Sequence, residues 1–400
     1  MLNFSLHIPT KIIFGKGEVG RTGEIVREHA KKVLVVTGRS STKKTGALDK
    51  VIKSLEGAGV GFVVFDQVEP NPRAETVDRG GQMARDENCD LILALGGGSA
   101  MDAAKAIATV AISGRPIHEY IRGNKTGLWK ELQPVKEALP VITIPTLAAT
   151  GSEANSNAVI TNWETKEKAG VSGPALFPRV AILDPELTYT VPAHYTADGA
   201  VDIFAHLYEG YMTGDENADV QDELTEGLMR NVVKYAKPAL ENPEDDHARA
   251  HLIWTSTLAL IGLTSAGREG SNPVHKIEHT LSAFYDISHG RGIAVLTPAY
   301  FRQIIRKDRP QRLARLGRQV FQVKHEDDLE ACDATIEAVQ EWFKEIGTLD
   351  TLKNLGIKQE ALKVMAEETI RVGGLGHNFL AATHPLTADE VLHLYEEVFE

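Results

Sequence analysis

Three of the fourteen histidines in the sequence, His275, His279 and His289, fall within one stretch of fifteen residues. In a helix with about 3.6 residues per turn, His275 and His279 lie one turn apart on the same face. Imidazole nitrogens at this spacing can bind one divalent metal ion together, and His289 follows closely enough to join them. The opposite face of the predicted helix is apolar and consists of Val274, Ile277, Leu281 and Phe284.

A second predicted helix places Asp202 and His206 four residues apart on one stripe, which Glu209 extends. Together with the first stretch, these side chains supply enough nitrogen and oxygen donors for a divalent ion. A polar stripe on an amphipathic helix is more often a face exposed to solvent, so each pair alone is a weak signal. Spacing also does not distinguish His275 from His279 as a ligand.

Composition and charge restrict the class of protein. The 400 residues are 42% hydrophobic, which suits about two globular domains with their own cores. The formal net charge of −12 argues against nucleic acid or an anionic membrane as a partner, because both attract clustered lysine and arginine. There is no apolar run of roughly 18 residues, as a membrane span would need. The two cysteines, Cys89 and Cys332, are too few for a disulfide framework, so we expect a cytoplasmic protein.

The order of the apolar runs predicts the elements that position these side chains. Residues 11–144 alternate short β-branched runs with helical patterns, which indicates a mostly parallel sheet covered by helices. Beyond residue 192, long helical patterns replace them. We therefore expect an α/β domain over residues 1–190 and an all-helical domain over residues 191–400. The predicted strands are residues 32–37, 61–66, 91–95, 140–144, 157–162 and 180–183.

The junction after the predicted strand 91–95 has the pattern of a phosphate-binding loop. Gly96, Gly97 and Gly98 lead from that strand into an alanine-rich helix, and glycines allow backbone amides to approach an anion closely. The motif is neither Gly-x-Gly-x-x-Gly nor a Walker loop, and a tight strand-to-helix turn is the structural alternative. Three consecutive glycines favour anion binding, because a plain turn rarely needs them.

Four short motifs follow one another along the chain. They are Gly96-Gly97-Gly98-Ser99 with Asp102, Pro145-Thr146 with Thr150-Gly151-Ser152-Glu153, Asp202-x-x-x-His206, and His275-x-x-x-His279 with His289-Gly290. Each motif is weak alone. In this order and spacing they resemble the iron-dependent (group III) alcohol dehydrogenases over nearly the whole chain, and most of all the butanol dehydrogenase-like branch.

The resemblance implies a role for each polar side chain of the two predicted helices. Asp202, His206, His275 and His289 would ligate one divalent ion, Fe(II) or Zn(II). The catalytic residue His279 would face the nicotinamide and the substrate without ligating the metal. The ion would act as a Lewis acid, while the cofactor carries the hydride between a small primary alcohol and its aldehyde, such as butanol and butanal.

The same resemblance implies a Rossmann-like N-terminal domain, an all-α C-terminal domain and an active site in the cleft between them. A homodimer is expected. The predicted contacts to the cofactor include Gly97, Gly98, Ser99, Asp102, Thr146 and Thr150.

One loop departs from the family pattern. Where other members carry Asp after the first strand to hold an adenosine 2′-hydroxyl, this chain reads Thr37-Gly38-Arg39-Ser40-Ser41. The segment from Gly38 to Lys44 contains three basic residues and no acidic one, so it can donate to a 2′-phosphate. We therefore expect NADP(H) to be preferred, with NAD(H) as the second cofactor. The predicted contacts in this loop are Gly38, Arg39, Ser40, Ser41 and Lys43.

Other functions remain in view. A lyase of the dehydroquinate synthase type shares the two-domain plan, but it needs more basic residues around its substrate than Lys276 and Arg291 supply. A polyol dehydrogenase of the same superfamily and a non-catalytic binder of nucleotide or metal are the further alternatives.

Overall fold

The computed structural model describes residues 1–121 and 134–400. The chain divides into two compact units. One is His7–Val191, and the other consists of Met1–Leu6 together with Pro192–Glu400. No helix among the described residues is long and apolar enough to cross a bilayer.

The first unit is built on a six-stranded parallel sheet with the strand order β1-β8-β5-β4-β2-β3. Its central strands are apolar runs because both faces of the sheet are covered, and every residue of β4 is buried. The strand β1 was not predicted, since it is a four-residue edge strand that is partly exposed. The strands are β1 (Lys11–Phe14), β2 (Lys32–Gly38), β3 (Gly61–Val68), β4 (Leu91–Gly96), β5 (Val141–Pro145) and β8 (Val180–Leu183).

The predicted strand 157–162 forms as β6 (Asn157–Asn162), but it does not join the parallel sheet. It pairs antiparallel with β7 (Glu167–Ser172), which was not predicted. The two strands make a separate hairpin.

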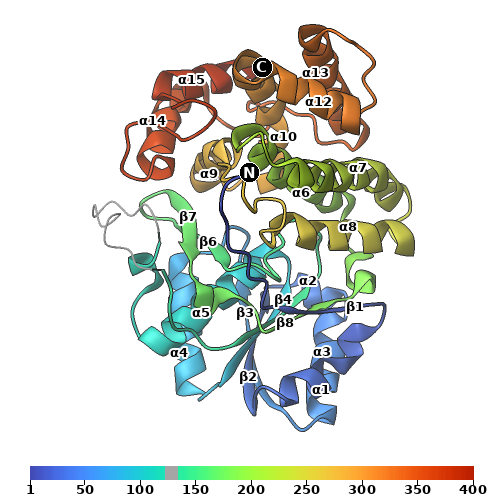
Figure 1. The fold of residues 1–400 in the computed structure, drawn as a ribbon. Coiled ribbons are helices and arrows are strands. Elements are labelled where there is room, and N and C mark those ends of the chain that lie inside the picture. The colour runs from blue at the N-terminus through green and yellow to red at the C-terminus, as the bar shows by residue number, and fades with distance from the viewer. Residues whose placement is uncertain (122–133) are drawn as a thin grey trace. The chain divides into compact units, whose positions relative to one another are not determined.

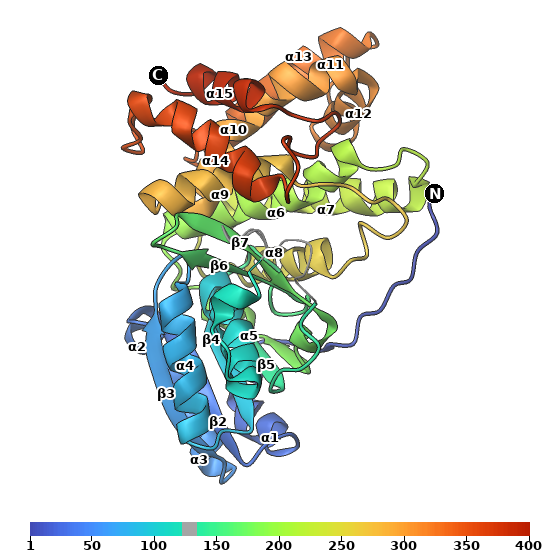
Figure 2. The same cartoon turned by 90° about the vertical axis from the view of Figure 1, so that its left-hand side faces the viewer.

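Helices cover both faces of the large sheet. Figure 1 shows α4 and α5 on one face and α1 and α3 on the other, and Figure 2 shows α4 and α5 from the front. The apolar side chains of α3, such as Val51 and Leu55, pack with Val33 and Leu93 of the sheet in one buried core. The helices of this unit are α1 (Thr22–Arg27), α2 (Ser41–Lys44), α3 (Ala47–Gly57), α4 (Ala74–Asp86) and α5 (Gly98–Ser113).

The strand order reverses between β2 and β4. The chain runs outward from β2 to β3, then crosses back to β4 on the other side of β2. Parallel sheets bind ligands at the carboxyl ends of the strands at such a reversal point. Thr37 is level with Leu95, and Gly96 is level with Pro145, so the loops after β2, β4 and β5 start at the same edge.

The second unit is helical, and its central members α6, α9 and α10 lie side by side (Figure 2). Helix α6 contacts both of the others. The helices are α6 (Ala193–Thr213), α7 (Asp219–Glu241), α8 (Asp246–Leu260), α9 (Pro273–Tyr285), α10 (His289–Tyr300), α11 (Arg306–Asp308), α12 (Pro310–Val320), α13 (Asp328–Glu345), α14 (Leu362–Gly373) and α15 (Ala388–Glu397).

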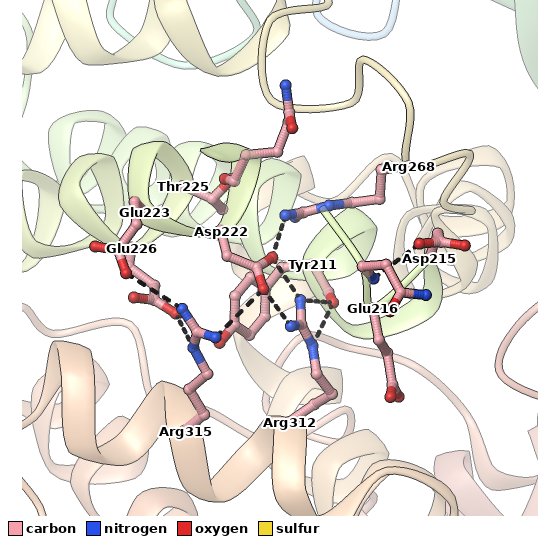
Figure 3. A network of polar contacts seen from close by, with 12 residues as sticks. Tyr211, Asp215, Glu216, Asp222, Glu223, Thr225, Glu226, Arg268, Arg312 and Arg315 are labelled. Carbon is pink, nitrogen blue, oxygen red and sulfur yellow. Dashed lines mark hydrogen bonds and ion pairs between the residues drawn. The ribbon is translucent and has the colours of Figure 1, made fainter. Parts of the chain in front are cut away.

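A buried charge network joins α7 and α12 to the segment before α9 (Figure 3). Asp222 is fully buried and accepts hydrogen bonds from Arg268 and from both terminal nitrogens of Arg312, at 2.5 and 2.8 Å. Glu226, also fully buried, accepts from Tyr211 (2.8 Å) and Arg315 (2.6 Å). Buried charges require such partners, so the network fixes the packing of these segments.

Candidate functional site

Helix α6 carries three polar side chains on one stripe in the interior of the helical unit. Most of its residues are buried because α7, α8, α9 and α10 contact it. Asp202 is 3% exposed and Glu209 is 0% exposed, and His206 lies between them on the same stripe. The predicted alternative, a face exposed to solvent, is therefore wrong for α6.

Three imidazoles from three helices converge on one oxygen atom of Asp202. The Nε2 atoms of His206 and His275 each lie 3.4 Å from Asp202 Oδ1, and Nε2 of His289 lies 3.6 Å from it. Asp202 Oδ1 is buried and accepts no hydrogen bond from any described residue. Because a buried carboxylate oxygen without a donor is costly, the arrangement fits a cation held among the four side chains.

The electrostatics of the cluster agree with that fit. Burial alone would raise the pKa of Asp202, but the three imidazoles outweigh it and hold this pKa below its ordinary range. Burial, helped by His275, lowers the pKa of His206 to about 3, so this imidazole is neutral and can offer a nitrogen lone pair to a cation. Against the effect of burial, Glu209 and Asp202 raise the pKa of His275 to about 10. The cluster thus contains an ionised carboxylate, Asp202, and its surroundings favour positive charge at His275.

Two fully buried carboxylates contact the histidines at the ring nitrogens that do not face Asp202. Glu209 contacts Nδ1 of His275, and Glu278 contacts Nδ1 of His289. Carboxylates in this position fix the ring orientation and the tautomer of metal-binding histidines. Spacing places Glu209 on the stripe of α6, but nothing in the spacing singles out Glu278, because its partner belongs to the next helix.

His289 is the first residue of α10, and its position depends on a close approach of α10 to α6. A Cβ atom on Gly290 would lie 2.1 Å from the carbonyl oxygen of Asp198 in α6, so only glycine fits. The Asp198 side chain accepts hydrogen bonds from Ser288 and Arg291, which flank His289 and Gly290. These contacts hold the start of α10 against α6.

His279 is half-buried on α9, and its ring centroid lies 5.5 Å from that of His289. Possible ligand atoms of Glu278, His279 and His289 lie within 4.8 Å of one another, as do those of Asp202, His275 and His289. The geometry therefore leaves two groupings. Only the second includes the buried oxygen that accepts no hydrogen bond. We keep His279 as a predicted catalytic residue outside the ligand set.

In the sheet unit, the predicted glycine junction forms as β4 followed directly by α5. Gly96 has φ +152°, and a Cβ atom on Gly98 would lie 2.5 Å from the Thr150 side chain. The amide of Thr146 donates to Gly96 O (3.0 Å), so both predicted threonines lie beside the glycines. The first turn of α5 contains no acidic residue. Its amides at Ala100 and Met101 donate to Gly97 O (3.1 and 3.2 Å), so the amides before them are the ones that can face an anion. A junction of this kind suits an anion.

A buried lysine holds the loop after β5 in place. Lys105 donates to Ser152 Oγ (2.9 Å), Asn155 Oδ1 (3.0 Å) and Asn157 O (2.8 Å). Both oxygens of Asp102 accept hydrogen bonds within the protein, one from Ser152 and one from the amide of Val159. Asp102 thus supports the loop. Its predicted contact with the cofactor stays a prediction, as do those of Ser99, Thr146 and Thr150.

The surroundings of the β2 loop differ from the expectation that no carboxylate lies there. Lys43 forms an ion pair with Asp66, and Arg39 lies 3.8 Å from Glu69. Asp66 lies near the end of β3, the strand next to β2, and Glu69 directly follows that strand. The loop itself lacks acidic residues, but the neighbouring strand supplies them. Arg39 remains 68% exposed.

Both parts of the chain match known family models. Residues 9–185 match the model described as iron-containing alcohol dehydrogenase. Residues 196–399 match the C-terminal model of the Fe-containing alcohol dehydrogenase family.

Individual relatives agree with these matches. NADH-dependent butanol dehydrogenase A of Clostridium acetobutylicum is 38% identical over 400 residues, covering 100% of both chains. The NADPH-dependent aldehyde reductase YqhD of Escherichia coli is 33% identical over 399 residues, covering 99% of both. The solved structure of NADH-dependent butanol dehydrogenase A of Thermotoga maritima has a TM-score of 0.93 and 35% identity, covering 100% of this chain and 99% of that one. The predicted family and its butanol dehydrogenase-like branch are confirmed: the chain belongs to the iron-containing alcohol dehydrogenase family and is an oxidoreductase that acts on alcohols.

Proposed function

We propose that this enzyme interconverts small primary alcohols and aldehydes of the butanol and butanal type, using NADP(H) and one divalent metal ion. The observation that carries the proposal is the convergence of three imidazole nitrogens on Asp202 Oδ1, a buried oxygen that accepts no hydrogen bond from the part of the chain that the structure describes. A site of this kind is built for a cation rather than for structural polar contacts.

In this proposal Asp202, His206, His275 and His289 hold the ion. A bound divalent ion supplies Lewis-acid polarisation of the substrate oxygen. Imidazoles bind a metal in their neutral form, so three of them and a single carboxylate would offset only one of the two charges of the ion, which preserves its Lewis acidity. The family name gives iron, and we propose Fe(II), with Zn(II) as a second metal because the affinity order favours zinc over iron.

We assign the dinucleotide to the predicted α/β domain, residues 1–190, and the metal to the predicted helical domain, residues 191–400. The amides of Gly97, Gly98 and Ser99 at the start of α5 would hold the pyrophosphate. Support for this comes from the close contact of Gly98 with Thr150 and from the absence of acidic residues in the first turn.

NADPH is proposed as the preferred cofactor, and Arg39 as the main residue that selects it. Its side chain is 68% exposed, and its contact with Glu69 is as long as 3.8 Å, so the guanidinium can turn to a 2′-phosphate. Lys43 contributes less, because Asp66 already pairs with it. A charge-assisted contact of roughly 1.5 to 3 kcal/mol gives a ten- to hundredfold preference. The names of the relatives include both NADH and NADPH.

The test of the cofactor proposal is kcat/KM for NADPH and NADH in the wild type and in Arg39→Asp. The substitution should lower the NADPH-to-NADH ratio by about ten- to hundredfold. Equal or better use of NADH by the wild type, with no change in the variant, would remove Arg39, Ser40 and Lys43 from the site.

The test of the reaction is absorbance at 340 nm with butanal and reduced cofactor. An oxidoreductase consumes the cofactor in stoichiometric amounts, whereas a lyase that uses nicotinamide transiently regenerates it. A protein that only binds nucleotide or metal leaves the absorbance unchanged. Stoichiometric loss supports the proposal, and either other outcome removes it.

For His279 we propose transfer of the alcohol proton, as expected of an imidazole beside the reacting groups. His279→Ala should keep its metal and lower turnover by ~10²- to 10⁴-fold. Elemental analysis of the purified variant checks the first half. Loss of the metal would make His279 a ligand, and unchanged turnover would leave it only a packing role.

Two further expectations concern the protein in the cell. Cys89 and Cys332 are free thiols, which supports the proposed cytoplasmic location, a reducing compartment. A homodimer is proposed as the oligomeric state, and light scattering after size exclusion tests it.

A further inference from the structure

We infer that Glu209 and Glu278 are positioning residues that set the tautomer of two ligand histidines, and that Glu209 imposes its tautomer more strictly than Glu278. The inference rests on the proposed function, in which His275 and His289 bind the metal through Nε2. Both glutamates contact histidines of the proposed ligand set, so they act through these histidines.

Each of the two carboxylates lies at the Nδ1 atom of one histidine. An ionised carboxylate only accepts hydrogen bonds, so Nδ1 of His275 and of His289 must carry the hydrogen. In the neutral ring, the Nε2 atom then carries a lone pair and no hydrogen. Both Nε2 atoms point to Asp202 Oδ1, at 3.4 and 3.6 Å. The carboxylates therefore select the tautomer that a metal requires.

The other oxygen of Glu209 accepts hydrogen bonds from backbone N–H groups, which can donate but cannot accept. Its Oε1 accepts from the backbone amides of Val274 and His275, in the first turn of α9. In Glu209→Gln the single amide oxygen is needed by these two N–H groups. The NH₂ group then faces Nδ1 of His275, and two donors cannot face each other. His275 must move its hydrogen to Nε2, where it blocks the metal.

The other oxygen of Glu278 accepts a hydrogen bond from a hydroxyl group, which can donate or accept. Its Oε1 accepts from the hydroxyl of Ser282, which also lies 3.3 Å from the carbonyl oxygen of Ile287. A hydroxyl both donates and accepts. In Glu278→Gln the amide can turn, so that its NH₂ group donates to Ser282 while its oxygen still accepts from Nδ1 of His289. The tautomer survives, and only the charge is lost.

The experiment measures the affinity of each metal-free protein for Zn(II) by competition with a chromophoric chelator. Changes to residues behind metal ligands typically weaken binding by ~10- to 100-fold. Glu278→Gln should lie near the ~10-fold end and Glu209→Gln at ~100-fold or beyond. The control is Glu226→Gln, which removes another fully buried carboxylate that contacts Tyr211 and Arg315, and it should leave affinity unchanged. Circular dichroism checks that each variant is folded.

Equal losses in Glu209→Gln and Glu278→Gln, or no loss in either, would overturn the inference. Should Glu209→Gln fail to fold, a second pair decides the matter. Glu278→Leu removes the acceptor that Glu278→Gln retains, so it should bind Zn(II) more weakly than Glu278→Gln; equal affinities would overturn the inference. If the wild type binds no divalent ion at all, the proposed function fails instead.

Discussion

Gly290→Ala should disable the metal site without touching a proposed ligand. The added Cβ atom would lie 2.1 Å from the carbonyl oxygen of Asp198, whereas ordinary contacts begin near 3.4 Å. Helix α10 must therefore retreat from α6 by about 1.3 Å at this point. His289, the preceding residue, moves with it and away from Asp202. Metal sites tolerate deviations of only about 0.2 Å in ligand distance, so the imidazole leaves ligand range.

Substitution of residues that hydrogen-bond to metal ligands weakens metal binding by ~10- to 100-fold, and the loss of Zn(II) affinity in Gly290→Ala should be at least as large. Chelator competition measures it, and circular dichroism shows whether the helical unit stays folded. The matched control is Gly210→Ala on α6, where a Cβ atom meets nothing within 4 Å. That change should stabilise the helix by roughly 0.5–1 kcal/mol and leave the affinity unchanged. A folded Gly290→Ala protein with wild-type affinity would refute the argument that the approach of α10 to α6 places His289.

Two further predictions concern stability. Asp222→Asn leaves Arg268 and Arg312 without their buried carboxylate, so the free energy of unfolding in urea should fall by about 3–5 kcal/mol. The control is Glu223→Gln, which should change the free energy of unfolding little, because the Glu223 side chain is 74% exposed. Equal effects of the two changes would refute this account of the network. His384 contacts Asp308 and Glu390, and although burial alone would lower its pKa, these carboxylates raise it. Its stabilising effect is therefore complete below the ordinary value of 6.5 and is lost as pH rises through the raised pKa. The melting temperature of His384→Asn should accordingly fall short of the wild type below pH 6.5 and approach it as pH rises through the raised pKa of His384. A gap independent of pH would contradict this.

The fold could be predicted where local sequence decides the structure. Buried strands such as β4 are continuous apolar runs, so they are visible without knowing their neighbours. Pairing is not local. The segment Asn157–Asn162 reads as a strand, but only the structure shows that it pairs with β7 outside the parallel sheet. The edge strand β1 is too short and too exposed to give a signal.

The candidate site was predictable to the extent that its side chains share a helix. The pair Asp202 and His206 follows from a spacing of four residues. Partners that come from other elements leave no such pattern. Glu278 reaches His289 across the turn between α9 and α10, and Asp66 reaches Lys43 from a neighbouring strand. Spacing on α9 also cannot separate His275 from His279, because the difference is which of them faces Asp202.

The central claim is that Asp202, His206, His275 and His289 hold the ion on which alcohol oxidation depends. The most direct measurement is the metal content of purified wild type and His275→Ala by elemental analysis, with the oxidation of butanol followed at 340 nm in the same samples. We predict one ion per chain and activity in the wild type, and loss of both in the folded variant. Full metal content in His275→Ala, or undiminished activity after complete removal of the metal from the wild type, would contradict the account.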